Sequence, residues 1–339
     1  MKILITGITG YIGSHTAIEI LKSPKLELIG IDNLSNSNVA SLDRIEQISG
    51  RKPKFYEIDL CDKEALANVF EKEKDIAGII HFAALKAVGE SVEQPLRYYH
   101  NNLESLVNLL TFCKEYKVNN FIFSSSCSLY GNVSQLPVNE DTPLSETESP
   151  YAHTKLVGEK ILRAFTEEAD TKICALRYFN PVGAHESGLN GELPIGKPNN
   201  LVPVITQTAS GMISKMTVFG TDYPTRDGSC VRDYIHVTDI AEAHVKALNY
   251  LVEDDNSDQF EVFNLGSGKG VTVIEAIEAF EKVSGLKLNY ELGPPRPGDV
   301  AAIYSDSSKA ESVLEWVPKR DLENMMSTAW KWKQMLNES

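Results

Sequence analysis

Short runs of β-branched and other apolar residues alternate, in the first half of the chain, with longer stretches in which apolar residues recur at helical spacing. Parallel β-α-β units produce this alternation. The runs predict six strands, at Lys2–Thr6, Leu26–Ile31, Lys54–Glu57, Gly78–Phe82, Asn120–Ser124 and Lys172–Arg177. Six such strands, each followed by a predicted helix, indicate an α/β fold with a doubly wound parallel sheet and a ligand at the carboxyl ends of its strands.

The sequence changes in character after the sixth predicted strand. Residues 181–203 are rich in Gly, Pro and Asn, which is typical of a binding loop, and we expect a second, smaller domain to begin there. Phe260–Leu265, followed by Gly266-Ser267-Gly268, predicts a late strand that returns to the first sheet. The two domains are therefore expected to be interleaved. The first comprises 1–180 plus about 234–267, and the C-terminal substrate domain comprises 181–233 plus 268–339.

A glycine-rich turn follows the first predicted strand. Gly7, Gly10 and Gly13 precede a helical pattern, and such glycines let the backbone turn tightly and approach a pyrophosphate. Asp32 ends the second predicted strand, where a carboxylate can bind an adenosine ribose and repel a 2′-phosphate. Neither the glycine turn nor the loop after Asp32 contains Lys or Arg, so the pattern favours NAD over NADP. Each feature also has a structural interpretation, because glycine turns occur in many folds and Asp before Asn33 is a common turn former.

Candidate catalytic residues lie at the end of the fifth predicted strand and in the helix predicted after it. Ser149 is a predicted helix N-cap and Pro150 a predicted first helical residue, so Tyr151 and Lys155 should share one face of the helix. A nearby positive charge favours a phenolate, which can accept a proton from an alcohol. Ser126 ends the fifth predicted strand and could assist that transfer. Tyr and Lys at this spacing also occur on solvated helix faces, and serines at strand ends often belong to polar loops.

Composition narrows the classes of partner. The 33 Lys and Arg against 47 Asp and Glu give a formal charge of −14, which argues against nucleic acid or an anionic membrane as the main partner. The five cysteines (Cys61, Cys113, Cys127, Cys174, Cys230) show no metal-binding spacing, so we expect reduced thiols and no metal. The N-terminus lacks a signal-peptide pattern and no apolar run approaches a membrane span, so a cytoplasmic location is expected.

The chain resembles the extended short-chain dehydrogenase/reductase family over nearly all of its 339 residues. The most specific stretches are Gly10–Thr16, His81–Ser91, Arg177–His185 and Val231–Val237. The resemblance implies a Rossmann-type sheet and reversible 4-epimerisation of UDP-glucose and UDP-galactose, a reaction of galactose and carbohydrate metabolism. The reaction would pass through a transient 4-keto sugar and NADH that stays bound, so NAD would be held tightly and not consumed. It also implies a homodimer formed through two helices of the first domain.

The resemblance assigns roles to individual residues. Tyr151 would be the base, Ser126 its proton-handling partner and Lys155 the charge that lowers the pKa of Tyr151. Beside these three residues, the implied cofactor contacts are Gly7, Gly10, Tyr11, Ile12, Gly13, Asp32, Asn33, Leu34, Ser35, Asn36, Ser37, Asp59, Leu60, Phe82, Ala83, Ala84, Leu85, Lys86, Asn101 and Phe179. The implied UDP-sugar contacts are Lys86, Ser126, Tyr151, Phe179, Asn180, Asn199, Asn200, Leu201, Thr217, Phe219, Arg232, Arg296, Asp299 and Ile303.

The residue types suit the roles at the nucleotide end. Arg232 and Arg296 could donate bidentate hydrogen bonds to a diphosphate, and Phe219 could present a flat face to uracil. Taken alone, each Arg is more often a surface charge. By the same resemblance, Ile303 stands at a position similar to a size gate for the sugar, where a large aromatic residue accompanies glucose-only forms and a small residue accompanies acceptance of N-acetylated sugars. Isoleucine is intermediate, and we expect UDP-glucose and UDP-galactose only.

Three other functions are considered. A 4-epimerase of UDP-N-acetylglucosamine or UDP-glucuronate would use the same catalytic residues, and a uronate enzyme would need a donor for the C5 carboxylate. A nucleotide-sugar dehydratase would need an acid and a base beside the catalytic hydroxyl, whereas Cys127 and Ser128 follow Ser126. A non-catalytic dinucleotide sensor is disfavoured because Ser126, Tyr151 and Lys155 are all present.

Overall fold

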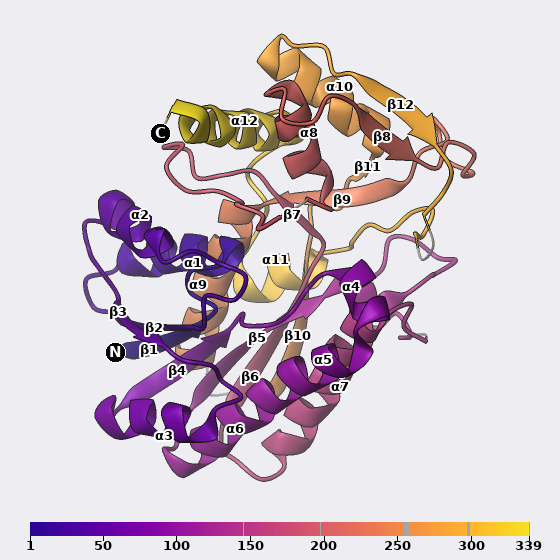
Figure 1. Ribbon diagram of the computed structural model, residues 1–339. Coiled ribbons are helices and arrows are strands. Elements are labelled where there is room, and N and C mark those ends of the chain that lie inside the picture. Colours follow the sequence, from indigo (N-terminus) through magenta and orange to yellow (C-terminus); the bar gives the residue numbers. More distant parts are fainter. Residues whose placement is uncertain (145, 197, 254–257, 297–298, 339) are drawn as a thin grey trace.

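A seven-stranded sheet occupies the lower half of the computed structural model as drawn in Figure 1. The structure describes residues 1–144, 146–196, 198–253, 258–296 and 299–338. The spatial order of the strands is β10-β6-β5-β4-β1-β2-β3, and every neighbouring pair is parallel. The strands are β1 (Lys2–Thr6), β2 (Glu27–Asp32), β3 (Lys54–Glu57), β4 (Ile76–His81), β5 (Asn120–Ser126), β6 (Lys172–Tyr178) and β10 (Phe260–Leu265).

The predicted strands are confirmed. The first six agree with the observed bounds to within two residues at each end, and Phe260–Leu265 returns to the sheet as its edge strand beside β6. The strands are buried on both faces, which explains why they appear in the sequence as nearly continuous apolar runs. Within β1, Ile3 and Ile5 enter one hydrophobic core and Leu4 enters the other. The doubly wound α/β fold is therefore correct.

Helices cover both faces of the sheet (Figure 1). On one face, the shared core includes residues of α1 (Tyr11–Leu21), α2 (Ala40–Ser49), α9 (Val237–Glu253) and α11 (Ser308–Leu314). On the other face, it includes residues of α3 (Lys63–Lys72), α6 (Ser105–Glu115) and α7 (Pro150–Thr166). The short helices α4 (Val88–Glu93) and α5 (Pro95–Tyr99) precede a π-helix, η1 (His100–Glu104), which runs into α6. A 3-10 turn, η2 (Cys127–Tyr130), follows β5.

The upper half of the molecule in Figure 1 has its own small sheets and core. Three strands lie in the order β11-β9-β7, and a parallel pair joins β12 to β8. Their bounds are β7 (Asn180–Val182), β8 (Met216–Phe219), β9 (Val231–His236), β11 (Gly270–Thr272) and β12 (Tyr290–Gly293). The helices of this half are α8 (Leu201–Ala209), α10 (Val273–Ser284) and α12 (Leu322–Glu338).

The chain passes repeatedly between the two halves. Strand β6 of the large sheet leads within two residues to β7 of the small sheet, and β9 runs directly into α9, which packs on α1. Strand β10 then returns to the large sheet before β11 pairs with β9. These crossings support the interleaved division into two domains, 1–180 plus about 234–267 and 181–233 plus 268–339, which we retain as a proposal.

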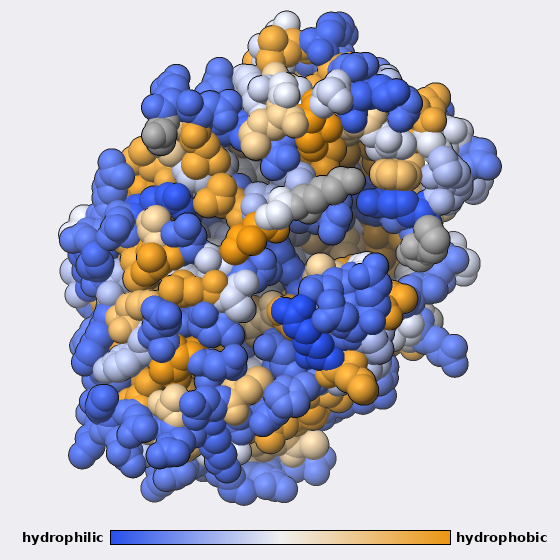
Figure 2. Space-filling model, viewed as in Figure 1, coloured by the Kyte–Doolittle hydropathy of each residue, from blue (hydrophilic) through white to orange (hydrophobic). Residues whose placement is uncertain are grey.

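The surface in Figure 2 is mostly hydrophilic, with hydrophobic side chains distributed among the polar ones. Across the described ranges, no helix combines the length and apolar composition that a membrane span needs. The sheet reverses its strand order between β1 and β4, because β1 lies between β2 and β4. In open α/β sheets the ligand lies outside the carboxyl ends of the strands at such a point.

Candidate active site

Gly7 and Gly13, in the turn after β1, are packed too closely to carry a side chain. Gly7 has a φ of +72°, and a Cβ at this position would lie 2.8 Å from the backbone nitrogen of Ala83. A Cβ on Gly13 would overlap the carbonyl oxygen of Gly7. Helix α1 begins directly after Gly10, with no side-chain cap on its first backbone N–H groups. These N–H groups are available to a phosphate, so the turn fits the pyrophosphate of a dinucleotide.

Asp32 ends β2 with its carboxylate buried and held in place. It accepts hydrogen bonds from the backbone nitrogens of Thr9 (3.1 Å) and Leu34 (3.0 Å) and from Oγ of Ser37 (3.0 Å). Leu34 has a φ of +58°, which shows how tightly the loop curls around the carboxylate. A carboxylate can accept about four hydrogen bonds, so one acceptor position is left for a ribose hydroxyl. The role of Asp32 in ribose binding stays a prediction.

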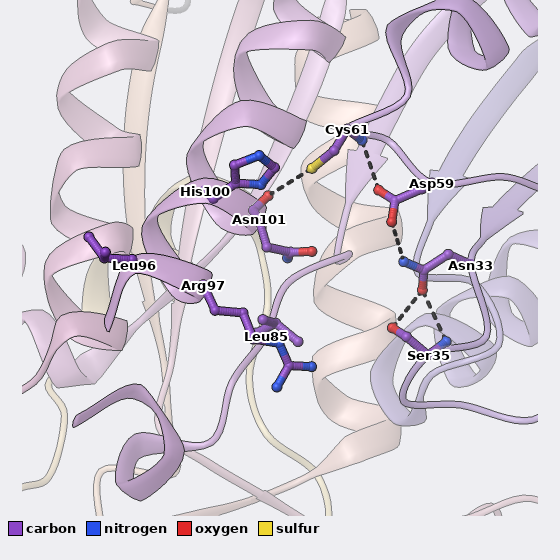
Figure 3. A pocket seen from close by; sticks show the side chains of 9 residues that line it. All are labelled: Asn33, Ser35, Asp59, Cys61, Leu85, Leu96, Arg97, His100 and Asn101. Carbon is purple, nitrogen blue, oxygen red and sulfur yellow. Dashed lines mark hydrogen bonds between the residues drawn. The ribbon is translucent and has the colours of Figure 1, made fainter. Parts of the chain in front are cut away.

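A cavity of about 520 Å³ lies beside these residues (Figure 3). Its volume falls within the roughly 300–1,000 Å³ range of small-molecule sites. Its lining includes five predicted cofactor contacts: Asn33, Ser35, Asp59, Leu85 and Asn101. Asn33 joins two of them, because its amide donates to Asp59 (3.0 Å) and its carbonyl accepts from Oγ of Ser35 (2.7 Å). The residues present therefore fit a dinucleotide.

Sequence reasoning missed the other four lining residues, Cys61, Leu96, Arg97 and His100. Two of them adjoin predicted contacts, since Cys61 lies two residues after Asp59 and His100 directly precedes Asn101. Arg97 belongs to α5, where the sequence showed no functional motif. It pairs with Glu90 at 2.5 Å and brings a positive charge to the cavity.

The catalytic residues predicted from sequence come together at the carboxyl end of β5. The predicted N-cap is confirmed, because Oγ of Ser149 accepts a hydrogen bond from the nitrogen of Ala152 (3.2 Å) and Pro150 is the first residue of α7. Tyr151 lies in the first turn of α7, close enough to Ser126 for the serine hydroxyl to lower the pKa of its phenol. One turn later, Nζ of Lys155 donates to the carbonyl oxygen of Ser124 at 2.6 Å.

Burial dominates the ionisation of Tyr151 and Lys155. Desolvation raises the pKa of Tyr151 to about 12, against a smaller lowering by the hydrogen bond to Ser126. Desolvation also lowers the pKa of Lys155 to about 8, and the nearby carboxylate of Glu159 opposes that shift. The ammonium of Lys155 is directed at a backbone carbonyl in this structure. That Lys155 lowers the pKa of Tyr151 therefore stays a prediction.

A buried ionic network lies behind the catalytic residues. The carboxylate of Glu159 accepts from Nε (3.0 Å) and Nη2 (2.7 Å) of Arg177 and from Oγ of Ser125 (2.5 Å). Arg177 also donates from Nη1 to the phenol oxygen of Tyr130 at 2.9 Å. Sequence reasoning missed this network, although Glu159 lies one helical turn after Lys155 and shares its face of α7. The network fixes β5, β6 and α7 relative to one another.

Four predicted contacts for the nucleotide end also lie together. The carboxylate of Asp299 is 3.4 Å from Nη2 of Arg232 and 2.9 Å from Nε of Arg296. The guanidinium of Arg296 lies over the ring of Phe219, 5.1 Å from its centroid. Two cations share one carboxylate here, so a net positive charge remains for an anion. The predicted aromatic face and the predicted diphosphate donors are thus adjacent.

The remaining predicted contacts fall into several groups. The phenol of Tyr11 donates to the carbonyl oxygen of Gly183 at 2.6 Å and so joins the two halves of the molecule. Phe82 packs its ring 4.7 Å from that of His244. Phe179 and Ile303 belong to one apolar cluster. Ile12 packs against the first core, Leu60 is buried in the second, Ala83 packs against the second, and Ala84 and Asn36 lie in the loops after β4 and β2.

Lys86 is paired with a residue that sequence reasoning did not consider. Its Nζ lies 3.5 Å from Oε1 of Glu192, which also accepts from the amide of Asn200 at 2.8 Å. Asn199 and Asn200 are exposed just before α8, which begins at Leu201. Asn180 begins β7 and Thr217 lies on β8. The roles of these residues in binding the UDP-sugar stay predictions.

Known proteins are similar to this chain in both sequence and architecture. A family model described as GDP-mannose 4,6 dehydratase matches residues 4–329. The chain is 49% identical to UDP-glucose 4-epimerase of Bacillus subtilis (strain 168) over 334 residues, which are 98% of this chain and 97% of the relative. Among solved structures, it is similar to UDP-glucose 4-epimerase from Bifidobacterium longum in complex with NAD⁺ and UDP. That similarity has a TM-score of 0.94 at 44% identity and covers 99% of this chain and 98% of the other.

A second solved structure, with a different ligand, is similar to this chain over its whole length. UDP-glucose-4-epimerase from Stenotrophomonas maltophila, with bound NAD and formylated UDP-arabinopyranose, matches with a TM-score of 0.95 at 41% identity. The match covers 100% of this chain and 99% of the other. The likeness therefore extends over both halves of the molecule and over both ends of the candidate site.

Proposed function

Because this chain belongs to the extended short-chain dehydrogenase/reductase family, we propose that it is an NAD-dependent isomerase that interconverts UDP-glucose and UDP-galactose. One observation carries the proposal beyond family membership. Tyr151, Ser126 and Lys155 lie together where β5 ends and α7 begins, and Cys127, which follows Ser126, is close enough to Arg232 for the arginine to lower the pKa of its thiol. A 4-epimerase needs this proximity, because the sugar must lie between the cofactor and the anchored nucleotide.

The proton chemistry belongs to Tyr151. Its phenolate would accept the proton of the sugar 4-hydroxyl, and the hydroxyl of Ser126 would stabilise the charge that this transfer moves. NAD supplies a reversible acceptor for the hydride of sugar C4 when it is bound. Burial raises the pKa of Tyr151 to about 12, so its phenolate, once formed, is a strong base toward the sugar 4-hydroxyl.

Anchoring of the nucleotide is assigned to the arginines. Arg232 and Arg296 would hold the diphosphate while the 4-keto sugar turns to present its other face, and Phe219 would contact the uracil ring. Arg232 is well placed for this role because its Nη1 is fixed by the carbonyl oxygens of Val231 (2.9 Å) and Val300 (2.8 Å). A fixed guanidinium loses little conformational freedom when it binds an anion.

The residues after β5 argue against a dehydratase activity, despite the description of the family model. Elimination of water needs an acid and a base beside the catalytic hydroxyl. In this chain Ser126 is followed by Cys127 and Ser128 in η2, and burial raises the pKa of the Cys127 thiol to about 12. Neither the thiol of Cys127 nor the hydroxyl of Ser128 is therefore an effective acid or base near neutral pH.

We also propose a homodimer and a cytoplasmic location. The helices α4 to α6 expose Val88, Val92, Leu96 and Val107, and Leu96 has 81% of its surface exposed. Packing two such helices from each subunit together would bury these apolar side chains. The five cysteines are free thiols, as expected in a reducing compartment.

The direct test uses the purified protein with UDP-galactose and no added NAD. Formation of UDP-glucose, followed by NMR until an equilibrium mixture is reached, would establish both the 4-epimerisation and a resident cofactor. No conversion, even after NAD is supplied, would overturn the proposal.

Tyr151→Phe tests the assigned base. We expect this variant to lose most of its turnover while retaining NAD, because the phenol is removed and the ring is kept. NAD content is measured after acid precipitation and serves as the control for folding. Turnover close to that of the wild type would show that another group accepts the proton.

A further inference from the structure

A cluster of metal-ligating side chains lies at the rim of the cofactor cavity and takes no part in the chemistry above. Cys61, His100 and Glu104 place one ligand atom each within 4.8 Å of the others. Within the described residues, they form the single group of three or more His, Cys, Asp and Glu side chains that could hold a metal ion. Cys61 and His100 also line the cavity.

Two elements bring the three side chains together. His100 and Glu104 are the first and last residues of the π-helix η1, and Nε2 of His100 lies 2.9 Å from Oε2 of Glu104. Cys61 lies in the turn between β3 and α3, and its Sγ is 3.8 Å from the carbonyl oxygen of Asn101. Figure 3 shows the thiol of Cys61 pointing toward the start of η1, where the ring of His100 lies.

The donor set suits zinc better than magnesium or calcium. A thiolate and an imidazole prefer a borderline-soft cation, whereas magnesium and calcium prefer oxygen ligands. Zinc–ligand distances of about 2.0–2.3 Å in a tetrahedron place the ligand atoms about 3.5 Å apart, so these side chains need to approach by only about 1 Å. His100 and Glu104 can move that far, because their side chains are 69% and 43% exposed.

We propose that Cys61, His100 and Glu104 form a binding site for one zinc ion, or a cation of similar chemistry, with water as the fourth ligand. None of the three residues is assigned to proton transfer, but Cys61 and His100 line the cavity that fits the dinucleotide, so the test below keeps the cofactor bound. A bound ion would link the turn after Asp59 to the helix that begins before Asn101. These two residues line the same cavity, so the ion would brace the part of the cavity between them.

The test uses cobalt as a spectroscopic substitute for zinc in the purified protein with its cofactor retained. After treatment with a chelator, we expect one equivalent of Co²⁺ to produce a thiolate-to-cobalt charge-transfer band and the visible bands of a tetrahedral site, and zinc to abolish both. Cys61→Ser should lose the charge-transfer band. His100→Gln and Glu104→Gln should each weaken zinc binding by at least about tenfold, measured by competition with a chromophoric chelator.

Glu115→Gln is the matched control for the loss of a negative charge. Glu115 lies exposed at the end of α6, the helix that continues from η1, and it is not one of the three ligands. This variant should bind cobalt and zinc as the wild type does. Absence of a charge-transfer band in the wild type would overturn the proposal. Equal zinc affinity in the wild type and in all three ligand variants would also overturn it.

Discussion

The buried pair of Glu159 and Arg177 allows a quantitative test of how the catalytic helix is held. Their side chains are only 7% and 5% exposed, and Glu159 accepts three hydrogen bonds, two of them from Arg177. Glu159→Gln keeps the size of the side chain but leaves the guanidinium charge uncompensated in the interior. Removing one partner of a buried ion pair costs about 3–5 kcal/mol. We expect the apparent free energy of unfolding to fall by that amount.

The measurement is urea-induced unfolding at a fixed, saturating concentration of NAD. The cofactor concentration must be held constant because ligand binding itself raises apparent stability. Glu168→Gln is the matched control, since it removes a carboxylate from the exposed pair with Lys114 (2.9 Å), and it should leave the midpoint unchanged. The double variant of Glu159→Met and Arg177→Met should recover much of the loss, because no uncompensated buried charge remains.

Two results would refute this account of the pair. If Glu159→Gln lowers the free energy of unfolding by less than about 1 kcal/mol, the pair behaves as a surface pair that water reaches. If the double variant loses as much stability as the sum of the losses measured for Glu159→Met and Arg177→Met made singly, the two side chains act independently. Either result would remove the basis for treating the network as the support behind Lys155.

Three further outcomes are expected. Gly13→Ala should lose bound NAD, because its Cβ would overlap a backbone carbonyl of the glycine turn, whereas Gly89→Ala, with no atom within 4 Å of its Cβ, should retain it. Ile303→Cys should let UDP-N-acetylglucosamine turn over by making room in the apolar cluster of the sugar site, and unchanged discrimination would place the size gate elsewhere. Turnover should rise with pH through about 8 and then level off, because the active pair of Tyr151 phenolate and Lys155 ammonium has lost one proton, and burial brings that first loss to about 8, the pKa of Lys155, while the pKa of Tyr151 is about 12. Glu159→Gln should move this rise to lower pH, since Glu159 raises the pKa of Lys155, and a profile that stays flat through pH 8 would contradict the role of Lys155.

The architecture was predictable because the physics of each element is local. Strands that are buried on both faces must be apolar runs, and the strands of the large sheet accordingly lie at the predicted positions in the sequence, with small errors at their ends. The start of α7 was equally clear, since a serine followed by proline satisfies the first turn of a helix. The turn after β1 could also be predicted, because the positions where a Cβ does not fit, such as Gly7 and Gly13, must be glycine and their spacing is visible in the sequence.

The features that were missed depend on contacts between distant segments. The pairing of Lys86 with Glu192 joins residues from different halves of the molecule, and no local sequence pattern predicts it. Arg97 and His100 line the cavity only because α5 and η1 turn toward it. The pKa of Tyr151 is a further case, because the spacing of Tyr and Lys predicts attraction between charges but contains no information about desolvation. Burial, which raises this pKa, is a property of the assembled site.

The two ends of the site differ in how firmly the fold holds them, and that difference suits an enzyme that must turn its substrate. Beside Arg232, the carboxylate of Asp233 is fully buried and accepts from the backbone nitrogens of Ser267 (2.7 Å), Gly268 (3.1 Å) and Ser305 (3.0 Å). These bonds tie β9 to two loops and fix the strand that carries Arg232. The sugar end is bordered by side chains such as Ile303, which make apolar contacts without direction. A nucleotide held by directional bonds and a sugar bordered in part by non-directional apolar contacts would separate anchoring from rotation, as the proposed inversion at C4 requires.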